Sequence, residues 1–164
     1  MKLSKMSRAL IALSLGILVN ASAHASSDFV PGKTEPIKPL LSWLNDVKAS
    51  IQAGKYDDAI DRLQKANDVN SAEWNNLMGY SMRKKATPDL YASEKYYQAA
   101  LTIDPMHKGT LEYYGELMLM KDDLAGAERL MDRLNKTCPS GCEEQLTLKN
   151  AIAKYKANTK DSDY

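Results

Sequence analysis

The sequence predicts an all-α protein: about three helical hairpins that stack into a short solenoid, closed by one further helix at the C-terminal end. Runs of β-branched residues, which favour strands, are almost absent between residues 40 and 157. Apolar residues in this region recur at the three- and four-residue spacing of a helix face. Pro105 and Pro139 each follow such a helix and stand 34 residues apart, a period typical of stacked helical repeats.

The first 25 residues have the pattern of a secretory signal peptide. Lys2, Lys5 and Arg8 precede an apolar run at residues 9–19, and small residues lead to a predicted cut after Ala25. The run is about half of the ~20 residues that a bilayer-spanning helix needs, so we expect no stable membrane insertion. The mature chain is therefore predicted to be exported and soluble.

Both ends of the predicted mature chain are polar. Residues 26–39 and 158–164 lack apolar periodicity and are rich in polar residues, so both are expected to be flexible tails.

Removal of the leader takes three positive charges from the formal net charge of +1 and leaves −2 over residues 26–164. A nearly neutral chain of mixed sign lacks the basic surface that nucleic acid requires, so no nucleic-acid partner is expected.

The first predicted hairpin, residues 40–66, is the weakest copy of the repeat. Trp43, Gly54 and Ala59 stand in register with the other two copies. Val47, however, occupies the position that holds a glycine in those copies. We therefore expect this hairpin to pack less regularly than the others.

The second predicted hairpin spans residues 74–105. Met78, Gly79 and Met82 line the inner face of its first helix. Thr87 followed by Pro88 predicts the start of its second helix, because a hydroxyl can cap a helix and proline suits the first turn.

The third predicted hairpin, residues 107–139, follows the same plan. Gly115 lies in the apolar face of its first helix, and Asp122 and Asp123 predict a tight polar turn before its second helix. Gly79 and Gly115 are expected to let the two helices of each hairpin approach closely, because glycine has no side chain at the contact.

These positions resemble the tetratricopeptide repeat, which carries Trp, Leu-Gly and Tyr on its first helix and Ala, a bulky apolar residue, Ala and Pro on its second. The resemblance covers residues 40–157 and implies a right-handed solenoid whose first helices form a concave, partner-binding face. The segments "NLMGYSMRK", "HKGTLEYYGELML" and "GCEE" are similar to exported bacterial proteins built from a few such repeats, which implies the bacterial periplasm.

A last helix is predicted to close the open end of the stack. Leu148 and Ile152 belong to an apolar stripe that can cover the third hairpin, while charged residues face away. Ser140 with Glu143 three residues later matches a capping box, so the helix is expected to begin within this segment.

The two cysteines of the chain, Cys138 and Cys142, bracket the corner before this closing helix. In an oxidising compartment nearby thiols tend to pair, and a disulfide would fix the angle of the helix. Two alternatives stay open: a copper or thiol-handling protein that uses both cysteines, and a redox pair. We favour the structural disulfide and expect no metal, because His107 is the one histidine after the predicted cut and redox pairs usually have two intervening residues.

The sequence contains few of the residues and motifs that catalysis commonly uses. One histidine after the cut leaves no Ser/His/Asp set or multi-histidine site to propose, and the common nucleophile, zinc and phosphate-loop motifs are missing from the sequence. We therefore expect neither an enzyme nor a cofactor. Three acidic pairs stand at turns or helix starts, where negative charge offsets the helix dipole: Asp57/Asp58, Asp122/Asp123 and Glu143/Glu144.

The predicted partner-binding residues lie on the first helices of the second and third hairpins. Their helical spacing places them on the face that the repeat resemblance assigns to partners, where they could bond to the backbone and charges of a peptide. An alternative remains open, in which Arg83 only pairs with Glu112 or Glu116 across neighbouring helices. The six residues are Asn76, Tyr80, Arg83, Lys84, Glu112 and Glu116.

Taken together, these features predict a non-catalytic protein–protein interaction scaffold or assembly factor of the bacterial periplasm. Its partner would be a peptide or a folded protein held on the concave face. The sequence names neither the partner nor the oligomeric state.

Overall fold

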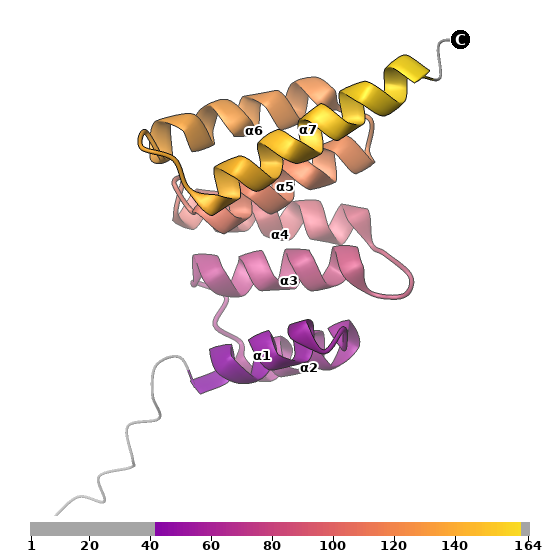
Figure 1. Ribbon diagram of the computed structural model, residues 1–164. Coiled ribbons are helices and arrows are strands. Elements are labelled where there is room, and N and C mark those ends of the chain that lie inside the picture. The colour runs from indigo at the N-terminus through magenta and orange to yellow at the C-terminus, as the bar shows by residue number, and fades with distance from the viewer. Residues whose placement is uncertain (1–41, 162–164) are drawn as a thin grey trace, which may run out of the picture. The chain divides into compact units, whose positions relative to one another are not determined.

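The computed structural model describes residues 42–161, and this part of the chain is entirely helical (Figure 1). The all-α class is confirmed for these residues, which form seven α-helices and no strand. The predicted signal peptide, 1–25, and N-terminal tail, 26–39, lie outside the described residues. The helices are α1 (Ser42–Gln52), α2 (Tyr56–Ala66), α3 (Ala72–Lys84), α4 (Leu90–Ile103), α5 (Lys108–Met120), α6 (Leu124–Thr137) and α7 (Glu143–Asp161).

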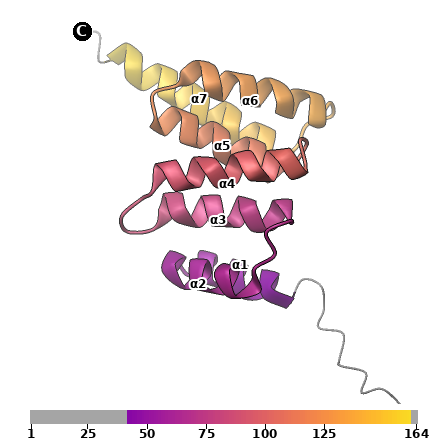
Figure 2. The same cartoon turned by 180° about the vertical axis from the view of Figure 1, so that it is seen from behind.

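Each helix packs against the next one along the chain, so most contacts are local in sequence. Two contacts go further: α3 lies against α5, and α5 lies against α7. In the two opposite views, α3, α4 and α5 follow one another in that order (Figures 1 and 2). The arrangement places the first helices of the second and third predicted hairpins next to each other.

Helix ends differ from the sequence predictions at two places. Helix α4 begins at Leu90 and not at Pro88, because Asp89 caps it by accepting a hydrogen bond from the backbone N–H of Ala92 at 2.9 Å. A carboxylate caps as well as a hydroxyl and also offsets the helix dipole, which favours Asp89 over Thr87. Asp89 was not considered in the sequence analysis.

Helix α7 begins at Glu143, inside the predicted segment but three residues after Ser140. It then continues to Asp161, so the helix includes residues 158–161 of the segment that was predicted to be a flexible tail. The apolar stripe ends earlier than the helix does, and for this reason the apolar periodicity did not reveal the last turn.

The turn between α5 and α6 is the tight polar turn that the sequence predicts. Asp122 adopts the left-handed conformation with φ of 59°, which aspartate tolerates better than most residues. Asp123 then caps α6 by accepting a hydrogen bond from the backbone N–H of Gly126 at 2.7 Å. Asp122 therefore shapes the turn through its backbone, and Asp123 does so through its carboxylate.

The two glycines of the hairpins make room for different neighbours. A Cβ atom on Gly79 would lie 2.6 Å from Cε1 of Tyr97 on α4, so this glycine brings together the two helices of one hairpin, as expected. A Cβ atom on Gly115 would lie 2.6 Å from Cδ1 of Leu148 on α7. The close approach at Gly115 thus seats the closing helix, which the sequence analysis did not predict.

Buried apolar residues form two clusters that together run through the described part. One cluster joins α1, α2 and α3 and contains Leu63 and Trp74, whose Nε1–H donates to the Leu63 carbonyl at 2.7 Å. The other joins α4 to α7 and contains Tyr97, Leu111 and Leu148, which are fully buried.

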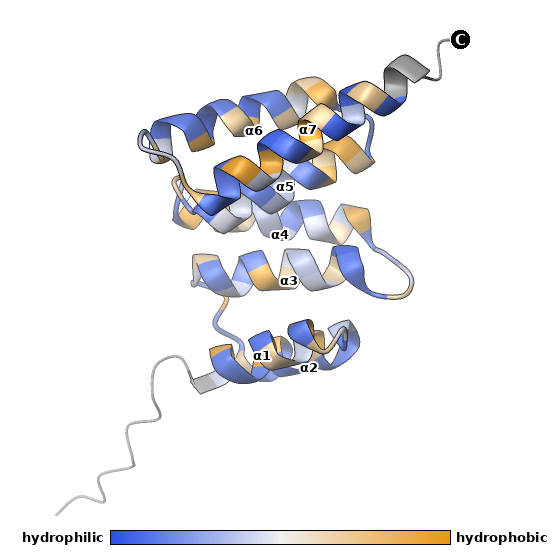
Figure 3. Ribbon diagram, in the orientation of Figure 1, coloured by the Kyte–Doolittle hydropathy of each residue, from blue (hydrophilic) through white to orange (hydrophobic). Residues whose placement is uncertain are grey.

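Hydrophilic and hydrophobic residues are interspersed along the helices (Figure 3). Within residues 42–161, no helix combines the length and the apolar character that a membrane span needs.

Candidate functional site

A groove of about 720 Å³ crosses the face formed by the first helices of the hairpins. Its walls come from α1, α3, α5, the segment that leads into α5, and the first turn of α7. We call this cavity the central groove. Its polar and aromatic lining includes Lys48, Glu73, Asn76, Tyr80, Asp104, His107, Lys108, Glu112, Tyr113, Glu143 and Glu144. Three other cavities in the described part are smaller, with volumes of about 260, 400 and 240 Å³.

The structure divides the six predicted partner-binding residues into two sets. Asn76, Tyr80 and Glu112 line the central groove. Arg83, Lys84 and Glu116 are not part of its lining. Lys84 is exposed at the last residue of α3, whereas Arg83 is buried with 5% of its side chain accessible.

Arg83 forms an ion pair inside the protein. Its Nη2 lies 2.6 Å from Oε2 of Glu116 on the neighbouring helix α5. The rings of Tyr80 and Tyr113 flank the guanidinium, with ring centres 5.6 and 5.9 Å from Cζ. Burial acts to lower the pKa of Arg83, but the nearby Tyr97 and Glu116 outweigh it and raise the pKa. The alternative of an internal pair is therefore realised, with Glu116 and not Glu112 as the partner.

Three tyrosines form a row from α2 through α3 to α5. The ring centre of Tyr80 lies 6.2 Å from that of Tyr56 and 4.6 Å from that of Tyr113. Burial, reinforced by the charge of Glu112, raises the pKa of Tyr113 to about 12, so its phenol stays neutral at physiological pH. Two members of the row, Tyr80 and Tyr113, give the groove a neutral, aromatic side next to its carboxylates.

Glu73 on α3 connects the groove walls formed by α1, by α3 itself and by the segment that leads into α5. Its carboxylate accepts from Lys48 Nζ at 3.1 Å and Asn76 Nδ2 at 3.3 Å, and lies 3.4 Å from His107 Nε2. The backbone N–H of Thr110 donates to His107 Nδ1 at 3.2 Å, which places the neutral ring's proton on Nε2, facing Glu73. Burial acts to raise the pKa of Glu73, but the hydrogen bonds from His107 and Lys48 outweigh it and lower the pKa. Glu73 is thus ionised and paired.

Glu112 has the opposite environment. It is 9% exposed, and within residues 42–161 no hydrogen bond or ion pair reaches its carboxylate. Burial, reinforced by the negative charges of Glu116, Glu144 and Glu143, raises the pKa of Glu112 to about 7, against a small opposing effect of Arg83. The groove therefore holds one carboxylate that is poorly satisfied when ionised.

Replacing Glu112 with glutamine should stabilise the protein above neutral pH. The folded pKa lies above the unfolded value of about 4.3, so the folded state retains a proton that the unfolded chain releases, and stability falls as pH rises from about 4.3 to 7. Glutamine keeps the shape without the charge. We expect E112Q to match the parent near pH 4 and to gain about 1–2 kcal/mol at pH 8, after allowance for solvent screening in the groove.

Urea unfolding across this pH range measures the difference. Asp132→Asn is the matched control, because Asp132 is an exposed carboxylate on α6 outside the groove. A gain that is the same at pH 4 and pH 8 would show that the charge of Glu112 is not its cause.

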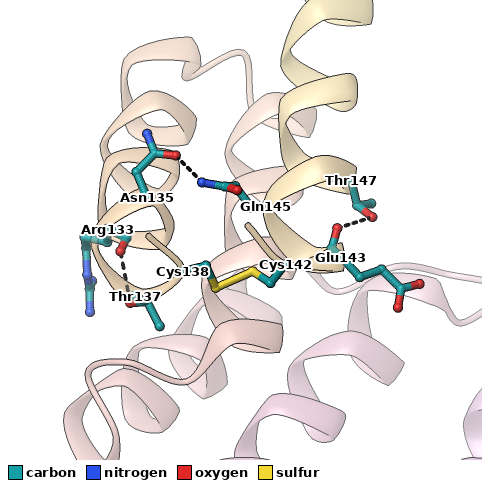
Figure 4. The surroundings of a disulfide bond; sticks show 8 residues. All are labelled: Arg133, Asn135, Thr137, Cys138, Cys142, Glu143, Gln145 and Thr147. Carbon is teal, nitrogen blue, oxygen red and sulfur yellow. Dashed lines mark hydrogen bonds between the residues drawn. A yellow bond between two sulfur atoms is a disulfide. The ribbon is translucent and has the colours of Figure 1, made fainter. Parts of the chain in front are cut away.

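The two cysteines meet at the corner between α6 and α7 (Figure 4). The sulfur atoms of Cys138 and Cys142 lie at the bonding distance of a disulfide, and their Cα atoms are 5.8 Å apart. Gln145 Nε2 donates to Asn135 Oδ1 at 2.7 Å across the same corner, which ties α7 to α6 a second time. The corner holds Glu143, the residue after the bridge, at the mouth of the groove.

Metal chemistry at the bridge would require its reduction, since both sulfur atoms are used in it. Among residues 42–161, no group of three or more His, Cys, Asp and Glu side chains is placed to hold a metal ion.

Several groove residues were missed from the sequence. Glu73 precedes Asn76 by three residues and so shares its helix face, a signal that helical spacing could have given. Glu143 and Glu144 were assigned only to a helix start, because the direction of α7 across α5 is not encoded in the local pattern.

No protein-family model matches the chain. No curated protein matches it in sequence.

Proposed function

We propose that the chain is an exported tetratricopeptide-like protein that acts as a non-catalytic scaffold or assembly factor and holds a segment of a partner protein in the central groove. The observation that carries this proposal is the groove itself, built mainly from the first helices of successive hairpins and the first turn of the closing helix. Its lining combines carboxylates, amides and phenol rings with two lysines, a histidine and apolar side chains, a mixture that can bind a peptide.

The repeat interpretation is supported by the helix pairs. The pairs α1/α2, α3/α4 and α5/α6 pack most extensively in the described part, and their second helices begin 34 residues apart, at Tyr56, Leu90 and Leu124. In a right-handed stack of such pairs the first helices line the inner face, and the contact between α3 and α5 is consistent with that arrangement.

The groove has the dimensions and chemistry for an extended peptide. A volume of about 720 Å³ is in the range of pockets that enclose several side chains. An extended segment leaves its backbone N–H groups free, and carboxylate and amide oxygens on the groove wall can accept from them.

The proposed compartment is the bacterial periplasm. Residues 1–25 have the pattern of a signal peptide, and a disulfide at Cys138 and Cys142 would form and persist after export. Both considerations favour the same oxidising compartment.

Site-specific photocrosslinking in living cells tests the proposal. A photoreactive amino acid is placed at Gln52 or Lys108, exposed positions on the groove wall, and for comparison at Gln64 or Asp132, exposed positions outside it. We expect a discrete partner adduct from the groove positions alone. Adducts that form equally at the outer positions, or at none of the four, would contradict the proposal.

A further inference from the structure

We infer that the partner segment is cationic, with a lysine or arginine side chain placed against Glu112 at the acidic end of the central groove. The inference rests on the proposed function and adds to it the chemistry of the partner. It follows from the charges that line the groove, from the unpartnered carboxylate of Glu112 and from a buried acceptor on Asn76.

The charges of the groove are unbalanced. Its lining contains five carboxylates but only two lysines and one histidine. Lys48 and His107 are both engaged by Glu73, so neither offsets the other four acids. Lys108 is exposed, and in the described part no ion pair joins it to them. The four remaining carboxylates belong to Asp104, Glu112, Glu143 and Glu144.

Glu112 is where a cation would be most strongly attracted. The residue is nine-tenths buried, yet within residues 42–161 its carboxylate lacks the partner that a charge in a buried residue normally has. The charges of Glu116 on its own helix and of Glu143 and Glu144 on α7 oppose its ionisation, and Arg83 on α3 offsets them only in small part. An ammonium or guanidinium group would remove this repulsion, whereas an acidic segment would add to it.

Asn76 provides a second, independent indication that a hydrogen-bond donor is missing. The side chain is 3% exposed, and its Oδ1 is buried without a partner. The amide orientation is fixed, because Nδ2 faces Glu73, whose ionised carboxylate can only accept. Oδ1 therefore lacks the N–H donor that a buried acceptor normally has, at a residue that lines the groove.

The test uses fluorescence anisotropy with the purified full chain and a terminally blocked, labelled peptide of four Lys-Ser repeats, at low salt and pH 8. The same peptide with glutamate in place of lysine is the charge control. We expect binding of the lysine peptide alone, weakened by added salt, and about tenfold weaker binding to Glu112→Gln. Asn76→Ala should also weaken it, while Asp132→Asn should bind as the parent does.

The outcomes separate this inference from the proposed function. Equal weakening by E112Q and D132N, or equal binding of the glutamate peptide, would overturn the cationic partner. If the groove positions still form a discrete adduct in cells, the scaffold role survives that result. Absence of adducts at Gln52 and Lys108 removes the proposed function and this inference with it.

Discussion

Replacing Glu116 with glutamine is expected to lower the free energy of unfolding by about 3 kcal/mol, because it leaves the buried guanidinium of Arg83 without a counter-ion. The value lies at the low end for a broken buried pair, since 27% of the Glu116 side chain reaches solvent. The flanking rings of Tyr80 and Tyr113 cannot replace the lost charge, because a cation–π contact is weaker than a buried ion pair.

A substitution at Arg83 tests whether the unpaired guanidinium causes this loss of stability. Arg83→Met removes the buried cation and leaves an apolar chain of similar length against the two tyrosines. In the Glu116→Gln background it should recover part of the lost stability, so that the double variant is more stable than E116Q alone. Guanidinium chloride unfolding of the three variants measures this, and additive losses would show that the two residues do not act as a pair.

The same variants address the predicted role of Arg83 in partner binding. Because Arg83 lies outside the groove lining and is 5% exposed, we expect the partner adduct at Lys108 to persist in Arg83→Met under conditions where this variant is folded. Loss of the adduct from a stably folded Arg83→Met protein would assign recognition to Arg83 in place of a structural role.

The helices were predictable because their determinants are local. Apolar spacing, the glycine at 79 and the acidic turn at 122–123 each act within one hairpin, so the sequence is sufficient to place α1 to α6 approximately. The start of α4 was missed because Thr87 and Asp89, two residues apart, can both cap a helix, and the sequence prediction considered only Thr87.

The candidate site was less predictable because it depends on contacts between helices. Helical spacing places Asn76, Tyr80 and Arg83 on one face of α3. The position of the neighbouring α5, which local spacing does not give, decides that Arg83 pairs with Glu116 while Asn76 lines the groove. The acidic end of the groove needs α7 to cross α5 in one direction. That direction follows from the disulfide between Cys138 and Cys142. It also follows from Leu148 on α7, which packs into the space that Gly115 leaves on α5.

Leu148→Ala is expected to cost about 3 kcal/mol, because Leu148 is fully buried and seats α7 against α5. Its Cδ1 and Cδ2 atoms occupy the space that a side chain at Gly115 would need, each 2.6 Å from an ideal Cβ there. Leu146→Ala is the matched control, since Leu146 lies on the same helix and is 59% exposed, and it should change stability little.

The fit between Leu148 and Gly115 can also be tested by adding a side chain at Gly115. Gly115→Ala in the parent should destabilise by about 1–2 kcal/mol, because overlap with Leu148 exceeds the gain of about 1 kcal/mol in helix propensity. In the Leu148→Ala background the overlap is gone, so the same substitution should be neutral or stabilising. A thermodynamic cycle from urea unfolding gives this coupling. If Gly115→Ala has the same effect in both backgrounds, Leu148 does not fill the space at Gly115 and another contact must orient the closing helix.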